Sequence, residues 1–213
     1  MLVEVAEATD IMNEWIAEIG HKEAKGFIEK WHYSRCCPTG KNMFFGWFVY
    51  LPNNKCEPLS RMPSLYAVAD YGIGVNPYQA QSLQKLTGIE VVNSQLLELK
   101  RLCRIEPRVD QLPLTKFLSK CQRHLRSQGF RFIVSFSDPE HSHNGGIYRA
   151  ANFSYLGKTN AETHAMDLDG NVRHRRYYFR YARRNNVSVE KAREALGLTL
   201  IKTQPKDRWF IKL

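Results

Sequence analysis

The sequence has little cysteine and no long apolar segment. Its 213 residues include only five cysteines, Cys36, Cys37, Cys56, Cys103 and Cys121. Because their number is odd and no Cys-x-x-Cys spacing occurs, neither a disulfide framework nor a zinc knuckle is expected. The acidic start "MLVEVAEATDIMNEW" lacks the basic end of a signal peptide, and no apolar run is long enough to span a bilayer. We therefore expect a soluble protein of a reducing cytoplasm with no membrane partner.

Acidic residues are also outnumbered. Lysine and arginine total 31 against 21 aspartates and glutamates, which gives a net charge of +10. A surplus of positive charge attracts polyanions, so a nucleic acid is the first partner to consider, with a basic protein of another kind as the alternative. Hydrophobic residues make up 43% of the chain, as in a folded domain. Internal repeats and linkers are absent, which predicts one α/β domain over residues 1–213.

The first half of the chain shows helical and then extended patterns. Apolar residues recur at helical spacing from Ala8 to Lys30, which predicts two opening helices on either side of Gly20. Residues 42–51 and 64–75 are aromatic and β-branched runs separated by a Pro- and Asn-rich turn, which predicts an antiparallel strand pair.

A strand, a helix and a second strand follow. The first strand covers residues 97–106 and ends at Pro107. The segment "LTKFLSKCQRHLRSQG" predicts an amphipathic helix with Thr115 as a possible cap. The segment "FRFIVSF" predicts the second strand, with Asp138 at its C-terminal end. Such a crossover makes the two strands parallel neighbours, and ligands of α/β sheets collect at strand C-termini. The patterns that remain predict a helix at 145–151, strands around "SYLGKTNAETHAMDL" and "RHRRYYFRYA", a helix capped by Ser188, and a final strand "RWFIKL".

The string "GGIYRAANF" (145–153) resembles the tyrosine helix of GNAT acyltransferases. Asn152 stands where that family has glycine, and asparagine also tolerates the left-handed conformation of a helix end. The resemblance implies a GNAT-like fold, with a mixed central sheet flanked by helices. It also implies that Tyr148 lies beside the acyl group and gives a proton to the leaving group, and a buried structural tyrosine is the alternative.

One segment departs from the GNAT pattern. The loop that grips coenzyme A pyrophosphate with glycine amides corresponds here to "DQLPLT", in which Pro113 and Thr115 occupy the glycine places. Proline has no amide hydrogen, so ordinary coenzyme A binding is not expected. The candidate donor-binding residues are Thr115, Lys116, Gly145, Gly146 and Asn152.

More specifically, "HYS" (32–34), "ELKRL" (98–102), "VSFSD" (134–138) and "GGIYRAANFSYLG" resemble the Mom family of bacteriophage Mu and its relatives. This resemblance implies an enzyme of the host cytoplasm that converts adenine in phage DNA to N6-carbamoylmethyladenine, with the base extruded from the duplex. The alternatives are a conventional acetyl-CoA-dependent N-acetyltransferase and a GNAT-shaped nucleic-acid-binding protein without catalysis. Oligomeric state is left open.

The carbamoylmethyl group of N6-carbamoylmethyladenine contains a nitrogen that acetyl transfer does not supply. An activated glycyl donor such as glycyl-tRNA accounts for every atom and makes tRNA a second partner. Acetyl-CoA is the alternative donor and would need a redox metal, but the sequence does not support bound iron. His141 and His143 are weak metal candidates, because His-x-His is common in solvent-facing loops.

Four residues are the catalytic candidates. Asp138 can take a proton from the adenine amine, and we expect it to share a pocket with Tyr148; a turn or cap role in "SDPEH" is the alternative. Glu98 and Arg101 have an odd separation, so a regular strand points them to opposite faces, whereas a bulge between them turns both inward. A surface ion pair is the alternative for Arg101.

Two segments are the candidates for nucleic-acid binding. His32, Tyr33 and Ser34 follow the second predicted helix, where GNAT enzymes shape the acceptor site, and Tyr33 is placed to stack on a flipped base. The segment "VRHRRYYFRYARR" interleaves arginines with aromatic residues, as a phosphate-binding strand does. Its candidates are Arg173, Arg175, Arg176 and Arg180, and a charged edge strand is the alternative.

Overall fold

A computed structural model of the chain describes residues 14–38, 40–50, 63–105, 112–141 and 143–213. They divide into two compact units. The first unit consists of Met1–Phe136, Gly145–Leu156 and Trp209–Leu213, and the second of Ser137–Asn144 and Gly157–Arg208. The expectation of one domain over residues 1–213 stays a prediction.

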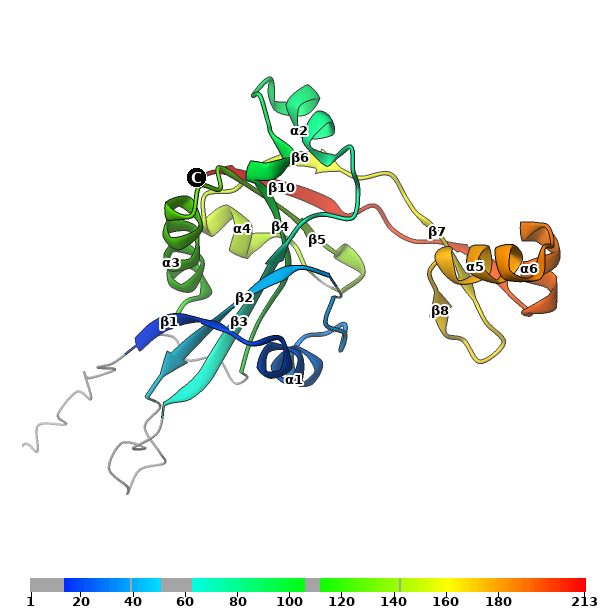
Figure 1. Cartoon of the computed structure of the whole chain (residues 1–213), viewed down its shortest axis with the longest axis horizontal. Coiled ribbons are helices and arrows are strands. Elements are labelled where there is room, and N and C mark those ends of the chain that lie inside the picture. The colour runs from blue at the N-terminus through cyan, green and yellow to red at the C-terminus, as the bar shows by residue number, and fades with distance from the viewer. Residues whose placement is uncertain (1–13, 39, 51–62, 106–111, 142) are drawn as a thin grey trace, which may run out of the picture. The chain divides into compact units, whose positions relative to one another are not determined.

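The largest sheet of the described residues is seven-stranded, in the order β1-β2-β3-β4-β5-β10-β6 (Figure 1). Its strands are β1 (Glu14–Ile19), β2 (Asn42–Val49), β3 (Ser64–Gly72), β4 (Leu96–Arg104), β5 (Phe132–Ser137), β6 (Ser154–Lys158) and β10 (Asp207–Lys212). Strands β1 to β4 pair antiparallel, whereas β4 and β5 pair parallel through the crossover helix between them. The mixed sheet confirms the predicted βαβ unit and the GNAT-like α/β fold class.

Helices cover both faces of this sheet. They are α1 (His21–Trp31), α2 (Gln79–Thr87), α3 (Leu114–Ser127) and α4 (Gly146–Ala150). The apolar stripe of α3 is fully buried, with Phe117 stacked on Trp47 of β2 at 5.6 Å between ring centroids. Helix α1 buries Ala24 and Ile28 in a separate cluster that includes Phe44. Since consecutive residues of a strand point to opposite faces, Phe44 and Phe45 divide the core between the two sides.

The second unit has its own small sheet. Strands β7 (Thr163–Met166), β8 (Val172–Arg173) and β9 (Thr199–Lys202) lie in the order β8-β7-β9. Helices α5 (Arg176–Asn185) and α6 (Val189–Ala195) accompany them, and Ala192 is fully buried. Ser188 caps α6 as predicted, because its side chain accepts a hydrogen bond from the Lys191 amide at 3.2 Å.

The first predicted helix is wrong where the structure describes it. Residues 14–19 form strand β1, which pairs antiparallel with β2 from Glu14 opposite Val49 to Ile19 opposite Phe44. Pairing with an existing apolar strand outweighs the local helical spacing, and Trp15 stacks on Phe48 across the pair. Helix α1 confirms the second predicted helix. Residues 8–13, Cys56, Pro107 and the turn between the two predicted strands lie outside the described residues.

The arginine-rich segment is also not the predicted strand. Residues 176–185 form helix α5, in which Tyr178 and Ala182, four residues apart, bury one face. Thr115 does not cap α3, since the N-cap residue is Pro113 and no side chain bonds there. Helix α2 and strand β9 were not predicted from the sequence.

The remaining predictions on membrane and redox chemistry can be compared directly. None of the described helices is both long and apolar enough to cross a membrane. Four cysteines are described, Cys36, Cys37, Cys103 and Cys121, and all are free, with Cys36 exposed and the others buried.

Candidate active site

Strand β4 carries a bulge, one of the two alternatives for the odd separation of Glu98 and Arg101. Arg101 is opposite Asp70 and Leu99 is opposite Tyr71, so Lys100 has no partner on β3. The parallel pairing with β5 ends at the same place, at Leu99 opposite Ser135, although both strands continue. The two strands therefore stop pairing beside the bulge, which opens the sheet at its centre.

The bulge changes which residues share a face of β4. Before it, Leu97 and Leu99 pack in the cluster that contains α3, and after it Cys103 packs in the cluster that contains α1. Glu98 and Arg101 therefore point to the same side despite their odd separation, as expected for a bulge between them. The Arg101 guanidinium donates to the Cys36 carbonyl at 3.1 Å and to the Lys100 carbonyl at 2.7 Å, which ties β4 to the segment after α1.

A buried carboxyl lies at the bulge, and the sequence analysis missed it. Asp70 is fully buried, and its Oδ2 accepts a hydrogen bond from the Asn42 amide at 3.4 Å. Lys100 donates to Asn42 Oδ1 at 2.9 Å, so Asn42 joins the lysine to the acid. Asp70 Oδ1 has no hydrogen-bond partner among the described residues. A lone acid inside the apolar strand "SLYAVADYG" was the sequence signal for this group.

Burial controls the ionisation of Asp70. Removal from water raises its pKa from 3.8 to about 7, although Lys100 and Arg101 act in the opposite direction. Glu98 adds to the increase through its negative charge. Desolvation likewise raises the pKa of the neighbouring Cys37 thiol, and Asp70 contributes to this shift. The bulge therefore holds an acid that titrates near neutral pH.

The tyrosine of α4 is anchored at the end of the parallel pairing. Ser135 Oγ lies 2.8 Å from the Leu99 carbonyl and 2.9 Å from the Tyr148 hydroxyl. Serine has one hydroxyl hydrogen, so Ser135 donates it either to the Leu99 carbonyl or to the Tyr148 oxygen. Burial raises the pKa of Tyr148, more than the Ser135 contact lowers it, and Tyr33 and Glu98 add to the increase. The phenol is therefore protonated at neutral pH and lies within electrostatic reach of two other candidate residues.

The backbone around Tyr148 adopts two left-handed conformations. Asn152 has φ of 63°, which confirms the prediction for the residue in the glycine place after the helix. Gly145 has φ of 72°, and a Cβ there would overlap the indole of Trp209. That indole is stacked on the Tyr148 ring at 5.6 Å between centroids. Gly145 is thus required both for its conformation and for the room that Trp209 occupies, while Gly146 begins α4.

The loop after α1 belongs to the same unit. His32 is buried, and its Nδ1 accepts a hydrogen bond from the Ser34 amide at 3.1 Å. Since Nδ1 is the acceptor, a neutral His32 carries its proton on Nε2. Tyr33 is 41% exposed and lies against the His32 ring, with centroids 4.3 Å apart. An exposed aromatic ring supported from behind is suited to stacking.

Two of the donor-binding candidates, Thr115 and Lys116, lie on α3, and their donor-binding role stays a prediction. Lys116 forms an ion pair with Glu14 of β1 at 2.7 Å, and Lys120 approaches the same carboxylate oxygen at 2.6 Å. Pro113 is the N-cap, and Thr115 lies in the first turn of the helix. The structure therefore gives the Lys116 ammonium a carboxylate partner within the fold.

Asp138 directly follows the C-terminal end of β5, as predicted, and belongs to the second unit. Its Oδ1 accepts a hydrogen bond from the Glu140 amide at 3.2 Å, and its Oδ2 pairs with Lys206 at 3.1 Å. The first of these is a contact of a turn residue, the alternative raised by "SDPEH", whereas the ion pair with Lys206 is long-range. The shared pocket of Asp138 and Tyr148 stays a prediction, because the two residues belong to different units.

The arginine candidates lie on or beside α5. Arg173 is paired with Asp167 at 2.8 Å and lies over the Tyr177 ring. Arg175 precedes the helix, and Arg176 and Arg180 lie one turn apart on it, all three exposed. Tyr177 and Phe179 are about half exposed. The helix therefore presents arginines and aromatic rings together, although in a different pattern from the predicted strand.

The histidine candidates are not the group closest to metal-binding geometry. The rings of His141 and His143 are 6.5 Å apart, and burial, followed by His141, lowers the pKa of His143. Among the described residues, Glu162, His164 and His174 offer ligand atoms that all lie within 4.8 Å of one another. The sequence analysis did not find this group, because His174 comes close to the other two residues only through the pairing of β7 with β8.

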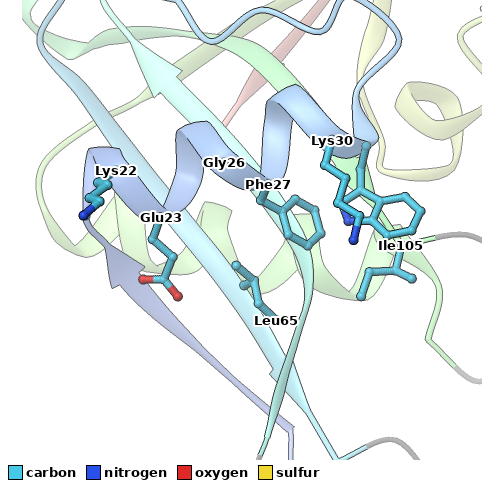
Figure 2. Close-up of a pocket in the computed structure, with 9 residues that line it drawn as sticks. Lys22, Glu23, Gly26, Phe27, Lys30, Leu65 and Ile105 are labelled. Atoms are coloured by element: carbon cyan, nitrogen blue, oxygen red, sulfur yellow. The ribbon is translucent and has the colours of Figure 1, made fainter.

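A groove of about 710 Å³ lies along one flank of α1, beside Leu65 of β3 and Ile105 (Figure 2). Phe27 and Trp31 of the helix line it together with Leu65 and Ile105, and Lys22, Glu23 and Lys30 also contribute. None of the predicted catalytic residues lies in it.

The pair Gly72 and Gly74 permits close packing beside β4. A Cβ at Gly72 would collide with Asn42 and Lys100, and one at Gly74 would collide with Gln79 and Glu98. Close approach of these side chains accounts for both glycines of the sequence "GIG" (72–74).

Two solved structures are similar to this chain at low sequence identity. A spermidine N-acetyltransferase variant from Vibrio cholerae is 8% identical with a TM-score of 0.49, and the match covers 93% of each chain. An IAA acetyltransferase from Bacillus cereus is 9% identical with a TM-score of 0.47, over 94% of this chain and all of the other. No curated protein matches the sequence.

The family comparison covers nearly the whole chain. The model of the Mom protein family matches residues 13–208, which include β4 with its bulge, the loop of His32, the helix of Tyr148 and the arginine helix. The chain belongs to the Mom protein family.

Proposed function

We propose that this chain modifies DNA by acyl transfer to the exocyclic amine of adenine and forms N6-carbamoylmethyladenine. The observation that carries the proposal is the match to the Mom family over residues 13–208. The geometry of the first unit supports acyl transfer, because a protonated phenol lies where β4 and β5 stop pairing. The net charge of +10 suits a DNA substrate.

We propose separate proton-transfer roles for Tyr148 and Asp138 in acyl transfer. The raised pKa of Tyr148 keeps a proton available for the leaving oxygen. Asp138 takes the proton that the adenine amine loses. The Tyr33 ring stacks on the extruded base, and Arg101 holds the segment that carries this ring through the Cys36 carbonyl.

The donor we propose is a glycyl group esterified to tRNA. The adenine N6 attacks the glycyl carbonyl, an N–C bond forms, and the ester C–O bond breaks to release the tRNA hydroxyl. The glycyl amine then attacks C6 through a five-membered ring, and the C6–N6 bond breaks. The former N6 becomes the amide nitrogen, so all atoms of the carbamoylmethyl group are accounted for without an oxidant.

Acetyl-CoA is the alternative donor. Pro113 at the start of α3 offers no amide to a pyrophosphate, and Lys116 is paired with Glu14. Acetyl transfer would also leave an N-acetyl group, which lacks the second nitrogen. Both points favour glycyl-tRNA over an acyl-CoA. The exposed arginines of α5 suit either nucleic acid.

Isotope labelling tests the proposal. Purified protein is incubated with duplex DNA and glycyl-tRNA labelled with ¹³C and ¹⁵N in the glycine, and the nucleosides are then analysed by mass spectrometry. We expect a carbamoylmethyl adenosine that carries both labelled carbons, with the labelled nitrogen attached to C6. Absence of label from the adenine excludes the glycyl route, and label transfer from acetyl-CoA would establish the alternative donor. Tight DNA binding with unmodified adenosine from every donor would support a non-catalytic protein.

A further inference from the structure

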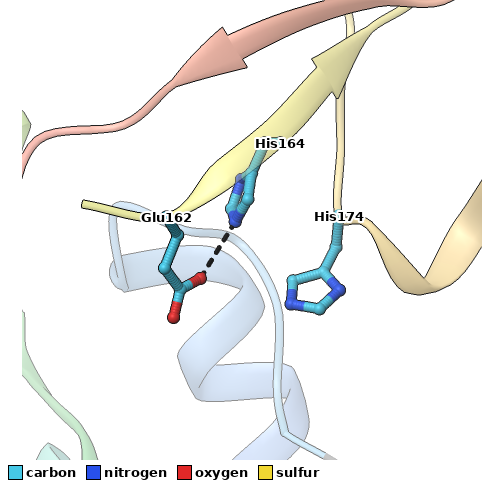
Figure 3. A group of neighbouring side chains, drawn as sticks. All are labelled: Glu162, His164 and His174. Carbon is cyan, nitrogen blue, oxygen red and sulfur yellow. Dashed lines mark hydrogen bonds and ion pairs between the residues drawn. The ribbon is translucent and has the colours of Figure 1, made fainter. Parts of the chain in front are cut away.

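A histidine pair and a glutamate in the second unit have the arrangement of a metal site (Figure 3). Glu162 immediately precedes β7, His164 lies on it, and His174 follows β8. His164 Nε2 and Glu162 Oε2 are 3.1 Å apart, and the rings of His164 and His174 are 5.2 Å apart.

The strand register explains why these three side chains meet. Ala165 is paired with Arg173 in the antiparallel ladder of β7 and β8. Extending this register by one residue, back along β7 and forward past the end of β8, places His174 opposite His164, and such partners on one face are neighbours. Glu162 is two residues before His164, so it projects from the same side of the extended chain. The convergence therefore follows from the backbone and does not depend on a single rotamer.

The distances fit a small ion bound by nitrogen and oxygen. In a tetrahedral site with ligand bonds near 2.1 Å, the ligand atoms are separated by about 3.4 Å. The distance of 3.1 Å between His164 Nε2 and Glu162 Oε2 is close to that value. A bound cation would replace the proton that these two atoms share. All three ligand atoms already lie within 4.8 Å of one another, and His174 is exposed. Binding requires a change of about 1.5 Å or less at the longest separation.

We propose that Glu162, His164 and His174 bind one divalent transition-metal ion of the zinc type. Two imidazoles and a carboxylate are the ligands that zinc prefers when cysteine is absent, and they leave a fourth position for water. The ion ties strand β7 to the segment that leads into α5, where Arg175 and Arg176 follow His174 directly. The site is independent of the acyl-transfer proposal, and its test does not require activity.

One local contact competes with the ion. His174 Nδ1 accepts a hydrogen bond from the Arg176 amide at 3.1 Å, and a neutral imidazole has one such lone pair. The ion must therefore displace this amide, either from Nδ1 or by a change of tautomer that frees Nε2. The Arg176 amide lies in the first turn of α5, where water can replace the lost partner.

Titration of the full-length, tag-free protein with ZnCl₂ tests the site. We expect one ion per chain, and we expect His164→Ala and His174→Ala each to weaken binding by at least about tenfold, since even outer-shell changes have effects of that size. His124→Ala is the matched control. His124 also pairs with a glutamate, Glu18, at 3.3 Å, but no second histidine completes a group there. Circular dichroism establishes that each variant is folded, and Glu162→Gln provides a third ligand variant that keeps the size of the side chain.

Cobalt separates this site from the cysteines. Co²⁺ bound by Glu162, His164 and His174 gives weak visible bands without the near-ultraviolet charge transfer of a thiolate ligand. The proposal is overturned if wild-type protein binds no ion, if the folded histidine variants bind as tightly as wild type, or if the cobalt spectrum shows thiolate coordination.

Discussion

Replacing Asp70 by asparagine should make the protein more stable at alkaline pH. Asp70 has a pKa of about 7 in the folded protein and an ordinary value of 3.8. Between these values the unfolded chain ionises Asp70 while the folded protein keeps it neutral, so the stability of the wild type decreases as pH rises. The decrease is about 1.4 kcal/mol per pH unit over about three units, or about 4 kcal/mol in all.

Urea unfolding followed by tryptophan fluorescence measures this effect. Asparagine keeps the shape of the side chain and cannot ionise, so Asp70→Asn removes this one titration and leaves all others in place. We expect the difference in unfolding free energy between variant and wild type to move by about 3 kcal/mol in favour of the variant from pH 5 to pH 8. If the difference is the same at both values, Asp70 is ionised throughout and is stabilised by Lys100 and Arg101, contrary to the argument from burial.

Three further predictions concern the site and its surroundings. Tyr148→Phe should lower the rate of adenine modification by about 100-fold or more but lower the unfolding free energy by only about 1 kcal/mol. Ser135→Ala breaks the same contact and should keep most of the activity. Equal losses of activity in the two variants, measured by nucleoside mass spectrometry, would contradict the role of Tyr148 as an acid. Gly145→Ala should lower the unfolding free energy by about 3 kcal/mol, because the added Cβ meets Trp209. The control Gly88→Ala, at nearly the same φ of 70° but with open space around it, should lower it by about 1 kcal/mol. Equal losses in denaturant unfolding would show that the Trp209 side chain moves to accommodate the Cβ. Replacing both Arg176 and Arg180 by alanine should reduce the slope of log K for DNA binding against log salt concentration by up to about two, measured by fluorescence anisotropy with duplex DNA. An unchanged slope would mean that these arginines do not contact the DNA phosphates.

The central βαβ unit could be predicted because its local and tertiary preferences agree. The α3 stripe from Phe117 to Leu125 has helical spacing, and it is buried on that face. Residues 14–19 and 176–185 show the opposite case. Trp15 and Ile16 fit a helix locally, but a free edge of β2 was available for pairing. In α5 the alternating aromatic residues favour a strand, whereas burial of Tyr178 and Ala182 selects a helix.

Parts of the candidate site that depend on short motifs were also predictable. The left-handed Asn152 was expected from the resemblance to the GNAT tyrosine helix, and a bulge between Glu98 and Arg101 was one of two alternatives for their odd separation. Asp70 and Asn42 were missed because their contact joins residues 28 positions apart, and the lysine that completes the group lies 58 positions from Asn42. Periodicity within one segment contains no information about such a contact.

The bulge at Lys100 connects the two halves of the candidate site. A regular β4 would point Arg101 away from the side that Glu98 faces, and the Cys36 carbonyl would lose the guanidinium that holds it. The same extra residue coincides with the end of pairing between Leu99 and Ser135, which is where the Tyr148 hydroxyl contacts the strand. The bulge at Lys100 therefore has two effects. It directs the Arg101 guanidinium to the loop that carries Tyr33, and it lies beside the place where the Tyr148 hydroxyl contacts the open part of the sheet. Because Lys100 also bonds to Asn42 beside the neutral Asp70, the bulge has a polar partner inside the core, and this contact gives the irregular strand a defined position.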